Sequence, residues 1–211
     1  HKGYPGFDWK KLEGITIMVI NNKDKRLVVL SAGGTAGHVF PAAALLKELE
    51  ARGWEVEIIT DSRGNNWADI LNIKANFQIK ASGFFGKGFF SKVIGLLKTF
   101  FGMIQTIFII LRLKPALVVG FGGYASIPAI LVASFRSIPT VIHEQNSVLG
   151  RANRFVAKRV DRIATSYKNV RYLEKTIENK VVFTGMPVRS LVEELRLQEY
   201  PEILGSSSLT I

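Results

Sequence analysis

The stretch RLVVLSAGGTAGHVFPAAALLKELEARG, residues 26–53, decides the fold of this chain. An apolar run ends at Ser31, a glycine-rich turn follows, and a stretch with helical periodicity then runs to Arg52. This order predicts a buried strand, a tight turn and a helix, which form the first part of a βαβ unit. Pro41 and Gly53 bracket the predicted helix, as proline near a helix start and glycine beyond its end commonly do.

The same alternation continues along the chain and predicts an α/β fold, a Rossmann-like parallel β-sheet flanked by helices. We expect seven strands, at Arg26–Ser31, Glu55–Thr60, Phe77–Lys80, Ala116–Val119, Thr140–Ile142, Arg162–Ala164 and Val181–Phe183. We expect helices at Pro41–Arg52, Ser91–Leu113, Ser126–Arg136 and Gly150–Arg159, and a short one near Asn66–Ile73.

The composition is that of a globular protein, because 47% of the 211 residues are hydrophobic and 21% are charged. The chain has no cysteine, which excludes disulfides and thiolate metal sites. Its three histidines show no HExxH spacing, which argues against a zinc enzyme, and we expect no metal.

The net charge of +11 comes largely from the middle of the chain. Between Ile70 and His143 there are eight Lys or Arg residues and no Asp or Glu. A basic surface of this kind suits an anionic membrane, a phosphorylated substrate or a nucleic acid. The simpler alternative is a solvated basic face over a buried helix.

Within this region, the segment SGFFGKGFFSK combines aromatic rings, lysines and glycines, a combination that predicts contact with a lipid interface. In the alternative, the rings cap the core below the sheet. The expected membrane contacts are Phe84, Phe85, Lys87, Phe89, Phe90 and Lys92.

The helix predicted at Ser91–Leu113 carries one apolar stripe at spacings of three and four. The stripe consists of Val93, Leu97, Phe100, Ile104, Ile107 and Leu111. A membrane span needs about 20 apolar residues, and the uninterrupted apolar run is shorter, so we expect this helix not to cross a bilayer.

Residues Gly33–Gly37 form a turn of the kind that brings the backbone close to a ligand and presents helix N–H groups to an anion. Gly34 and Gly37 match the second and third glycines of the dinucleotide fingerprint, but Ala32 occupies the first position. Asp61, at the end of the second predicted strand, is a candidate partner for a ribose. A dehydrogenase therefore stays open at this point.

A second glycine-rich turn follows the fourth predicted strand and leads into the next helix. Its residues are Gly120, Gly122, Gly123, Tyr124 and Ser126. Two such turns at the carboxyl ends of parallel strands face one crevice and suit a diphosphate held between two helix N-termini. In the alternative, each is only a tight turn.

A third motif, VIHEQNSVLGRANR, places His143, Glu144 and Asn146 directly after the fifth predicted strand. These side chains offer a general base, an orienting acid and a contact for a sugar hydroxyl or a phosphate, although a lone histidine is more often structural. His38 closes the first glycine turn at the same edge of the sheet. Arg189, after the seventh strand, either reaches a phosphate or tethers a linker.

The motifs GGTAGHVFPA, GFGGYASIPA, HEQNSVLGRANR and TGMPVR resemble, in order and spacing, the amino-terminal domain of the MurG-type N-acetylglucosaminyltransferase family. The resemblance implies the amino-terminal half of a two-domain GT-B-type glycosyltransferase. It also implies a hexosyltransferase activity in peptidoglycan biosynthesis: transfer of N-acetylglucosamine from UDP-N-acetylglucosamine to lipid I (undecaprenyl-pyrophosphoryl-MurNAc-pentapeptide), which forms lipid II. The anomeric configuration inverts, without metal, cofactor or covalent intermediate.

The resemblance further implies roles for individual residues. The catalytic positions are His38 as the candidate base, His143 and Glu144. The donor-binding positions are Thr35, Ala36, Gly37, Asn146 and Arg189. The acceptor diphosphate is expected at Gly33, Gly34, Gly122, Gly123, Tyr124 and Ser126. The implied partners are UDP-N-acetylglucosamine, lipid I and the anionic surface of the bacterial inner membrane on its cytoplasmic side, with no nucleic acid.

We expect residues 1–24 to be an extension outside the fold, residues 25–190 to be the acceptor-binding domain, and residues 191–211 to be a linker toward a missing donor-binding domain. Without that domain the chain by itself is expected to be inactive. Two alternatives stay open. One is an oxidoreductase with a dinucleotide in the first glycine turn, and the other is a membrane-surface or anionic-ligand binding module without catalysis.

Overall fold

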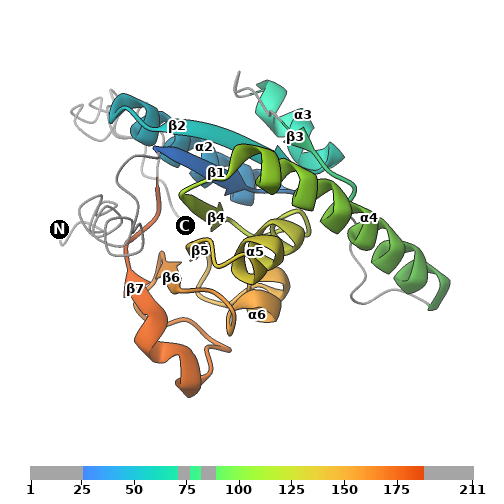
Figure 1. Cartoon of the computed structure of the whole chain (residues 1–211). Coiled ribbons are helices and arrows are strands. Elements are labelled where there is room, and N and C mark those ends of the chain that lie inside the picture. Colours follow the sequence, from blue (N-terminus) through green and yellow to red (C-terminus); the bar gives the residue numbers. More distant parts are fainter. Residues whose placement is uncertain (1–25, 71–76, 82–88, 188–211) are drawn as a thin grey trace, which may run out of the picture.

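The computed structural model describes residues 26–70, 77–81 and 89–187. Seven parallel strands form one sheet in the order β3-β2-β1-β4-β5-β6-β7 (Figure 1). The strands are β1 (Leu27–Ser31), β2 (Glu55–Thr60), β3 (Phe77–Gln78), β4 (Leu117–Gly120), β5 (Thr140–Glu144), β6 (Arg162–Thr165) and β7 (Val181–Phe183). Because all neighbours are parallel, the carboxyl ends of the strands meet at one edge of the sheet. This confirms the predicted Rossmann-like α/β fold.

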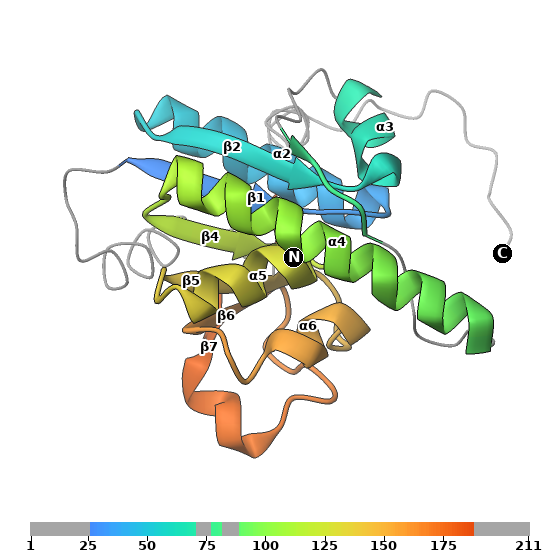
Figure 2. The same cartoon turned by 45° about the vertical axis from the view of Figure 1, so that its right-hand side comes forward.

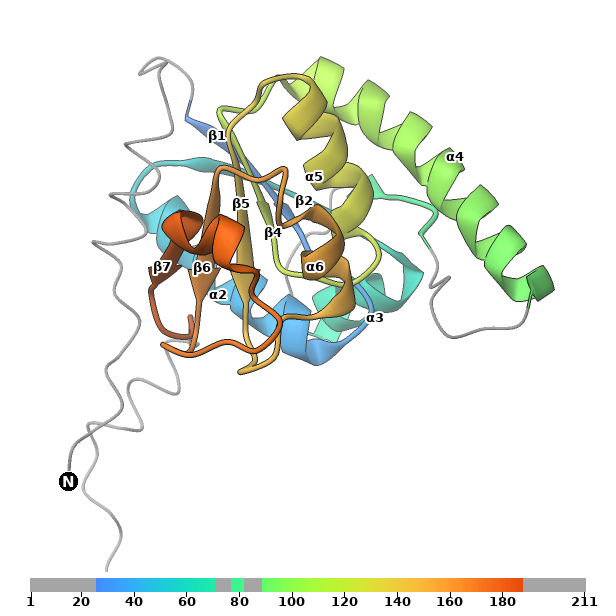
Figure 3. The same cartoon turned by 90° about the horizontal axis from the view of Figure 1, so that it is seen from below.

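Helices cover both faces of the sheet, so that the fold has three layers (Figure 3). Helix α2 lies on one face, and α4, α5 and α6 lie on the other. The helices are α2 (Ala36–Ala51), α3 (Ser62–Ile70), α4 (Phe89–Leu113), α5 (Ser126–Phe135) and α6 (Arg151–Val156), with a 3₁₀ helix, η1, at Lys175–Lys180.

The two hydrophobic cores follow from the alternation of side chains along each strand. In β1, Val28 and Leu30 face the α2 side, whereas Val29 faces α4 and α5. All three are fully buried, as expected for a parallel sheet covered on both faces. Burial on both faces of the sheet therefore explains the near-continuous apolar runs from which the strands are predicted.

Several boundaries differ from those predicted by a few residues, and two of the differences move functional residues. Helix α2 begins at Ala36, inside the glycine turn, rather than at Pro41, which lies within the helix. The turn passes directly into the helix, and proline there removes only the hydrogen bond to Gly37 one turn earlier. Strand β5 runs to Glu144, so His143 is a strand residue rather than a loop residue.

Helix α4 presents its smallest residues to the fold and its apolar stripe to the outside. Its buried positions are Gly95, Thr99, Gly102, Thr106 and Ile110. The predicted stripe, from Val93 to Leu111, is exposed along its whole length, with Phe100 58% exposed. The alternative of a buried helix therefore fails for this stripe.

Close backbone packing explains this orientation. A Cβ atom on Gly102 would overlap the Lys80 carbonyl, and Gln105 Oε1 accepts a hydrogen bond of 2.8 Å from Lys80 N. The two buried threonines donate their hydroxyls to carbonyls of the same helix, so that their burial leaves no unpaired donor. Small residues on the packed face of a helix allow its backbone to approach a neighbouring segment closely.

That this helix does not cross a bilayer stays a prediction, although by length and composition alone it could span one. The segment Val93–Leu113 has 21 residues and a mean hydropathy of 1.9, which is long and apolar enough for a span. Core helices of soluble proteins pass the same test, but only 28% of the apolar window here is buried. The outer face of α4 therefore needs an explanation beyond core packing.

The close approach of Gly102 to Lys80 predicts that alanine at this position destabilises the protein, opposite to the effect expected from helix propensity. Gly102→Ala should lower the free energy of unfolding by about 1–3 kcal/mol, because α4 must shift away from Lys80. Alanine at an unhindered helical glycine stabilises instead. Gly37→Ala in α2 is the matched control, since a Cβ there would meet only Thr35 Oγ1 at 3.8 Å. Equal effects of the two substitutions in urea unfolding would contradict this packing.

Candidate functional site

The two glycine turns lie against each other at the carboxyl edge of the sheet. A Cβ on Gly123 would overlap the Gly33 carbonyl, and Gly123 has a φ of 76°, which favours glycine. On the other side, a Cβ on Gly33 would lie 2.9 Å from Ala125 Cβ. The switch in strand order falls between β1 and β4, and the turns that follow these strands share one crevice.

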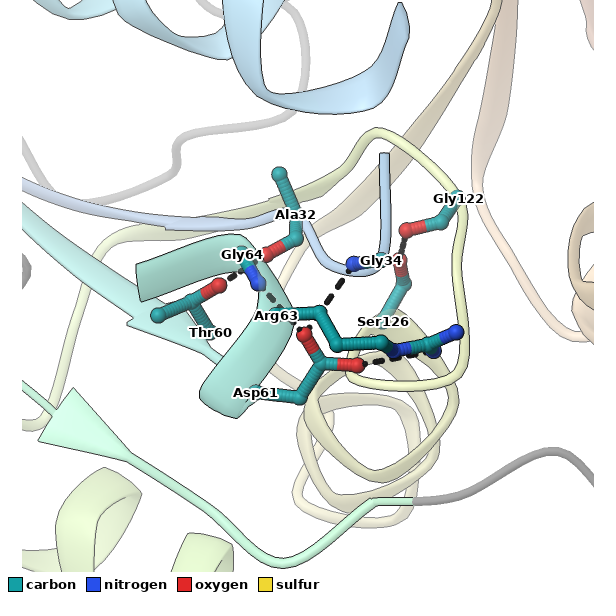
Figure 4. A network of polar contacts seen from close by, with 8 residues as sticks. All are labelled: Ala32, Gly34, Thr60, Asp61, Arg63, Gly64, Gly122 and Ser126. Atoms are coloured by element: carbon teal, nitrogen blue, oxygen red, sulfur yellow. Dashed lines mark hydrogen bonds and ion pairs between the residues drawn. The ribbon is translucent and has the colours of Figure 1, made fainter. Parts of the chain in front are cut away.

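Asp61 fixes the shape of the first turn, as Figure 4 shows. Its Oδ1 accepts hydrogen bonds from Gly34 N at 3.0 Å and Gly64 N at 2.8 Å, and its Oδ2 pairs with Arg63 at 3.1 Å. The side chain is 1% exposed. The Asp61 carboxylate is thus buried and bonded to groups of the protein, so it is not placed to bind a ribose. The residue that favoured a dinucleotide in the sequence therefore has a structural role.

Two serine hydroxyls donate to backbone carbonyls of the second turn. Ser126 donates to the Gly122 carbonyl, and Ser31 donates to the Ala125 carbonyl at 3.1 Å. Both serines are buried. Ser126, a predicted diphosphate contact, therefore uses its hydroxyl to hold the second turn, and its role toward a ligand stays a prediction.

The start of α2 is suited to an anion. Thr35 is the N-cap and is exposed, and within the described part of the chain the amides of Ala36 and Gly37 have no acceptor. The Arg63 guanidinium lies next to the same turn, since a Cβ on Gly34 would meet its Nη2 at 3.3 Å. Its side chain is 56% exposed, so a phosphate can reach unpaired N–H groups and a cation at one place.

His38 lies between the two turns. A Cβ on Gly122 would be 3.0 Å from His38 Cε1, so this glycine makes room for the imidazole ring. The ring is partly exposed, and its Nδ1 is 3.3 Å from Gln145 Oε1. His38 is therefore the one predicted catalytic residue that is both held in place and open to a ligand.

His143 lies deeper. Its Nε2 is 3.1 Å from the Gly185 carbonyl and its Nδ1 is 3.2 Å from Gln145 Nε2. Burial lowers the pKa of His143 from 6.5 to about 4, against smaller opposing effects of the Gly185 carbonyl and Glu144. The ring is therefore neutral near pH 7 and has both nitrogens occupied.

Glu144 organises the loop that follows β5. Its Oε1 accepts from the backbone N and the side-chain Nδ2 of Asn146, at 3.0 and 3.1 Å. Its Oε2 accepts from Gly150 N at 2.8 Å and Asn153 Nδ2 at 2.9 Å. With four donors and 1% exposure, Glu144 positions the exposed Asn146.

The structure thus gathers both glycine turns, His38 and Asn146 at one edge, with Tyr124 partly exposed where the second turn ends. Arg189, Phe84, Phe85 and Lys87 lie outside the described residues, as do the side chains of Phe89, Phe90 and Lys92. Sequence reasoning missed Arg63, Gln145 and Asn153. Each lies beside or within a motif already singled out, but nothing in the motifs shows which polar side chains turn inward.

The sheet order is that of Rossmann-like folds in general, and the comparisons with known proteins identify this one as the amino-terminal half of a GT-B-type glycosyltransferase. Residues 28–165 match the family "Glycosyltransferase family 28 N-terminal domain". The chain belongs to this family.

Individual relatives agree with this assignment. The chain is 45% identical over 187 residues to the UDP-N-acetylglucosamine--N-acetylmuramyl-(pentapeptide) pyrophosphoryl-undecaprenol N-acetylglucosamine transferase of Paramagnetospirillum magneticum, covering 89% of this chain and 50% of the relative. The enzyme of the same name from Rhodospirillum rubrum is 44% identical, with coverages of 82% and 44%. The crystal structure of Acinetobacter baumannii MurG has a TM-score of 0.63 and 29% identity, with coverages of 83% and 50%. The chain spans about half the length of these relatives.

The buried His143 predicts a loss of stability in acid. Between pH 6.5 and about pH 4 the unfolded chain binds a proton that the folded chain does not, so the free energy of unfolding falls as the pH is lowered through this window. The full contribution, about 3 kcal/mol, is present above pH 6.5. Urea unfolding of wild type and His143→Gln at about pH 7 and about pH 5 measures the part, about 2 kcal/mol, that is lost over this interval. An unchanged pH difference in the variant would show that other groups are responsible.

Proposed function

We propose that this chain is the acceptor-binding half of an inverting N-acetylglucosaminyltransferase that converts lipid I into lipid II with UDP-N-acetylglucosamine as donor. The observation that carries the proposal is the pair of glycine turns in backbone contact, with His38 between them and Arg63 at their edge. The names of the relatives supply the substrates. The donor-binding half is expected from a carboxyl-terminal domain like that of the relatives.

In this proposal the diphosphate of lipid I lies at the glycine turns. The amides of Ala36 and Gly37 and the Arg63 guanidinium offset its charge, and the missing side chains of the glycines allow the backbone to approach it. Thr35, Asn146 and, outside the described residues, Arg189 are proposed to contact the donor.

The chemical step then needs one base. His38 Nε2 accepts the proton of the 4-hydroxyl of the N-acetylmuramoyl sugar while that oxygen attacks the anomeric carbon of the donor. The bond from this carbon to the phosphate oxygen breaks, and its electron pair leaves with UDP. A single displacement inverts the configuration. We assign His143 and Glu144 to positioning, because both are buried and fully hydrogen-bonded.

A full-length transferase that contains this sequence should transfer labelled N-acetylglucosamine to a lipid I analogue. His38→Ala should lower kcat by roughly 100-fold or more, because the base is lost. Asn146→Ala should raise KM for UDP-N-acetylglucosamine, because a donor contact is lost. Radiolabel incorporation measures both.

Ser147→Ala, an exposed neighbour in the same loop, is the control and should leave transfer unchanged. Absence of transfer by the folded wild-type enzyme would overturn the proposed function. Full activity of His38→Ala would overturn only the assignment of the base. Stabilisation by NAD(H), with no response to UDP-sugars, would favour the oxidoreductase alternative.

We also propose that the outer face of α4 docks on the cytoplasmic surface of the bacterial membrane, where a lipid-linked acceptor resides. Large apolar side chains cover this face, among them Phe100, Phe101 and Phe108, which are 55–69% exposed. In Figure 2, α4 extends past the sheet on the side where the strands end. The sequence from residue 71 to residue 142, which includes α4, contains lysines and arginines but no Asp or Glu, and this charge suits anionic headgroups.

A hollow of about 570 Å³ lies beside this helix. On one side it is lined by Ser62, which precedes Arg63, and by Lys80; on the other it is lined by Leu97 and Phe101 of α4.

The docking proposal is tested by flotation of the chain with vesicles that contain anionic phosphatidylglycerol. Phe100→Ser/Phe101→Ser/Phe108→Ser should weaken vesicle binding by roughly tenfold or more, because three rings no longer insert. Phe135→Ser/Phe155→Ser removes equally exposed rings from α5 and α6 and should have little effect. Equal losses in both variants would indicate non-specific adhesion and contradict docking by α4.

A further inference from the structure

Gln145 lies between the two histidines of the site. It follows β5, is 4% exposed, and has no role among the sequence expectations. Its Oε1 is 3.3 Å from His38 Nδ1, and its Nε2 is 3.2 Å from His143 Nδ1. One amide therefore contacts the same ring atom of both histidines, from opposite ends.

Backbone carbonyls fix the orientation of this amide. Nε2 donates to the Phe121 carbonyl at 3.0 Å and lies 3.2 Å from the His143 carbonyl. Carbonyl oxygens only accept, so a reversed amide would place Oε1 against two acceptors and lose both of these hydrogen bonds. The hydrogen-bond network thus requires Oε1 to face His38.

The hydrogen-bond partners of the two rings require opposite tautomers. Since Oε1 only accepts, His38 Nδ1 must carry the proton and donate it, which leaves Nε2 with the lone pair. The Gly185 carbonyl also only accepts, so His143 Nε2, at 3.1 Å from it, must carry the proton, and the lone pair of this neutral ring lies on Nδ1, which faces Gln145 Nε2. Within the described residues, His38 Nε2 has no hydrogen-bond partner in the fold.

We propose that Gln145 is a positioning residue that holds His38 in the Nδ1–H tautomer, so that its Nε2 is the proton acceptor presented to the substrate hydroxyl. The role of Nε2 as base rests on the proposed function, whereas the tautomer does not. A neutral histidine side chain in water favours the opposite, Nε2–H form, which cannot accept a proton at that atom. Gln145 therefore converts His38 into a base that points toward the glycine turns.

Two-bond ¹H–¹⁵N spectra of the imidazole rings test the tautomers in this chain, which has only three histidines. At a pH where the rings are neutral, His38 should show the Nδ1–H pattern and His143 the Nε2–H pattern. Gln145→Met keeps the length of the side chain and removes both hydrogen bonds. In this variant His38 should change to the Nε2–H form, while His143 stays Nε2–H because Gly185 still holds it, which also shows that the fold is intact.

If Gln145→Met does not fold, Gln145→Glu retains an acceptor at the Oε1 position and should keep His38 in the Nδ1–H form. An Nε2–H pattern of His38 in the wild type overturns the proposal. So does an Nδ1–H pattern in folded Gln145→Met.

Kinetics of the full-length transferase give the second readout. Gln145→Met should lower kcat roughly tenfold or more with little change in KM for either substrate, because only the population of the reactive tautomer falls. Gln145→Glu should recover part of kcat. A rise in KM with unchanged kcat would contradict the positioning role. If the spectra agree with the proposal but His38→Ala remains active, the tautomer stands and the assignment of the base in the proposed function fails.

Discussion

The backbone contact between Gly33 and Gly123 is the constraint on which the rest of the site depends. No side chain fits between the two turns, because a Cβ on Gly123 would overlap the Gly33 carbonyl. This contact brings the start of α2 beside the second turn and leaves room for the His38 ring against Gly122. A loop pair that approached less closely would separate the anion-binding amides from the imidazole. The glycines thus serve the contact between loops as much as any contact with a ligand.

Two buried carboxylates keep the turns and the following loop in place. Asp61 accepts from amides of the first turn and of α3, and Glu144 accepts from the loop after β5. By residue type both resemble ligand-binding or catalytic acids, yet their oxygens are occupied by donors of the protein. Removing such an acceptor would leave several buried N–H groups unpaired, so their role is structural support for residues that stay exposed.

Helix α4 inverts the usual relation between hydrophobicity and burial. Glycine and threonine face the fold, where close backbone packing needs small residues, and the large apolar side chains face outward. Its stripe was visible in the sequence as a helical period, but periodicity gives only the existence of an apolar face and not its partner. The partner was decided by the shape of the surface around Lys80, which accepts Gly102 and would exclude a phenylalanine.

The sequence by itself determined the sheet, the two glycine turns at its carboxyl edge and the membership of the turns and His38 in one site. Strand alternation, turn chemistry and motif spacing are local properties that can be read along the chain. The exact start of α2, the inward direction of Asp61, Ser126 and Glu144, and the link of Gln145 to both histidines were decided only by the tertiary structure. A polar side chain at a strand end has a ligand and a backbone amide as competing partners, and only the folded arrangement of neighbouring loops shows which of them lies within hydrogen-bond distance.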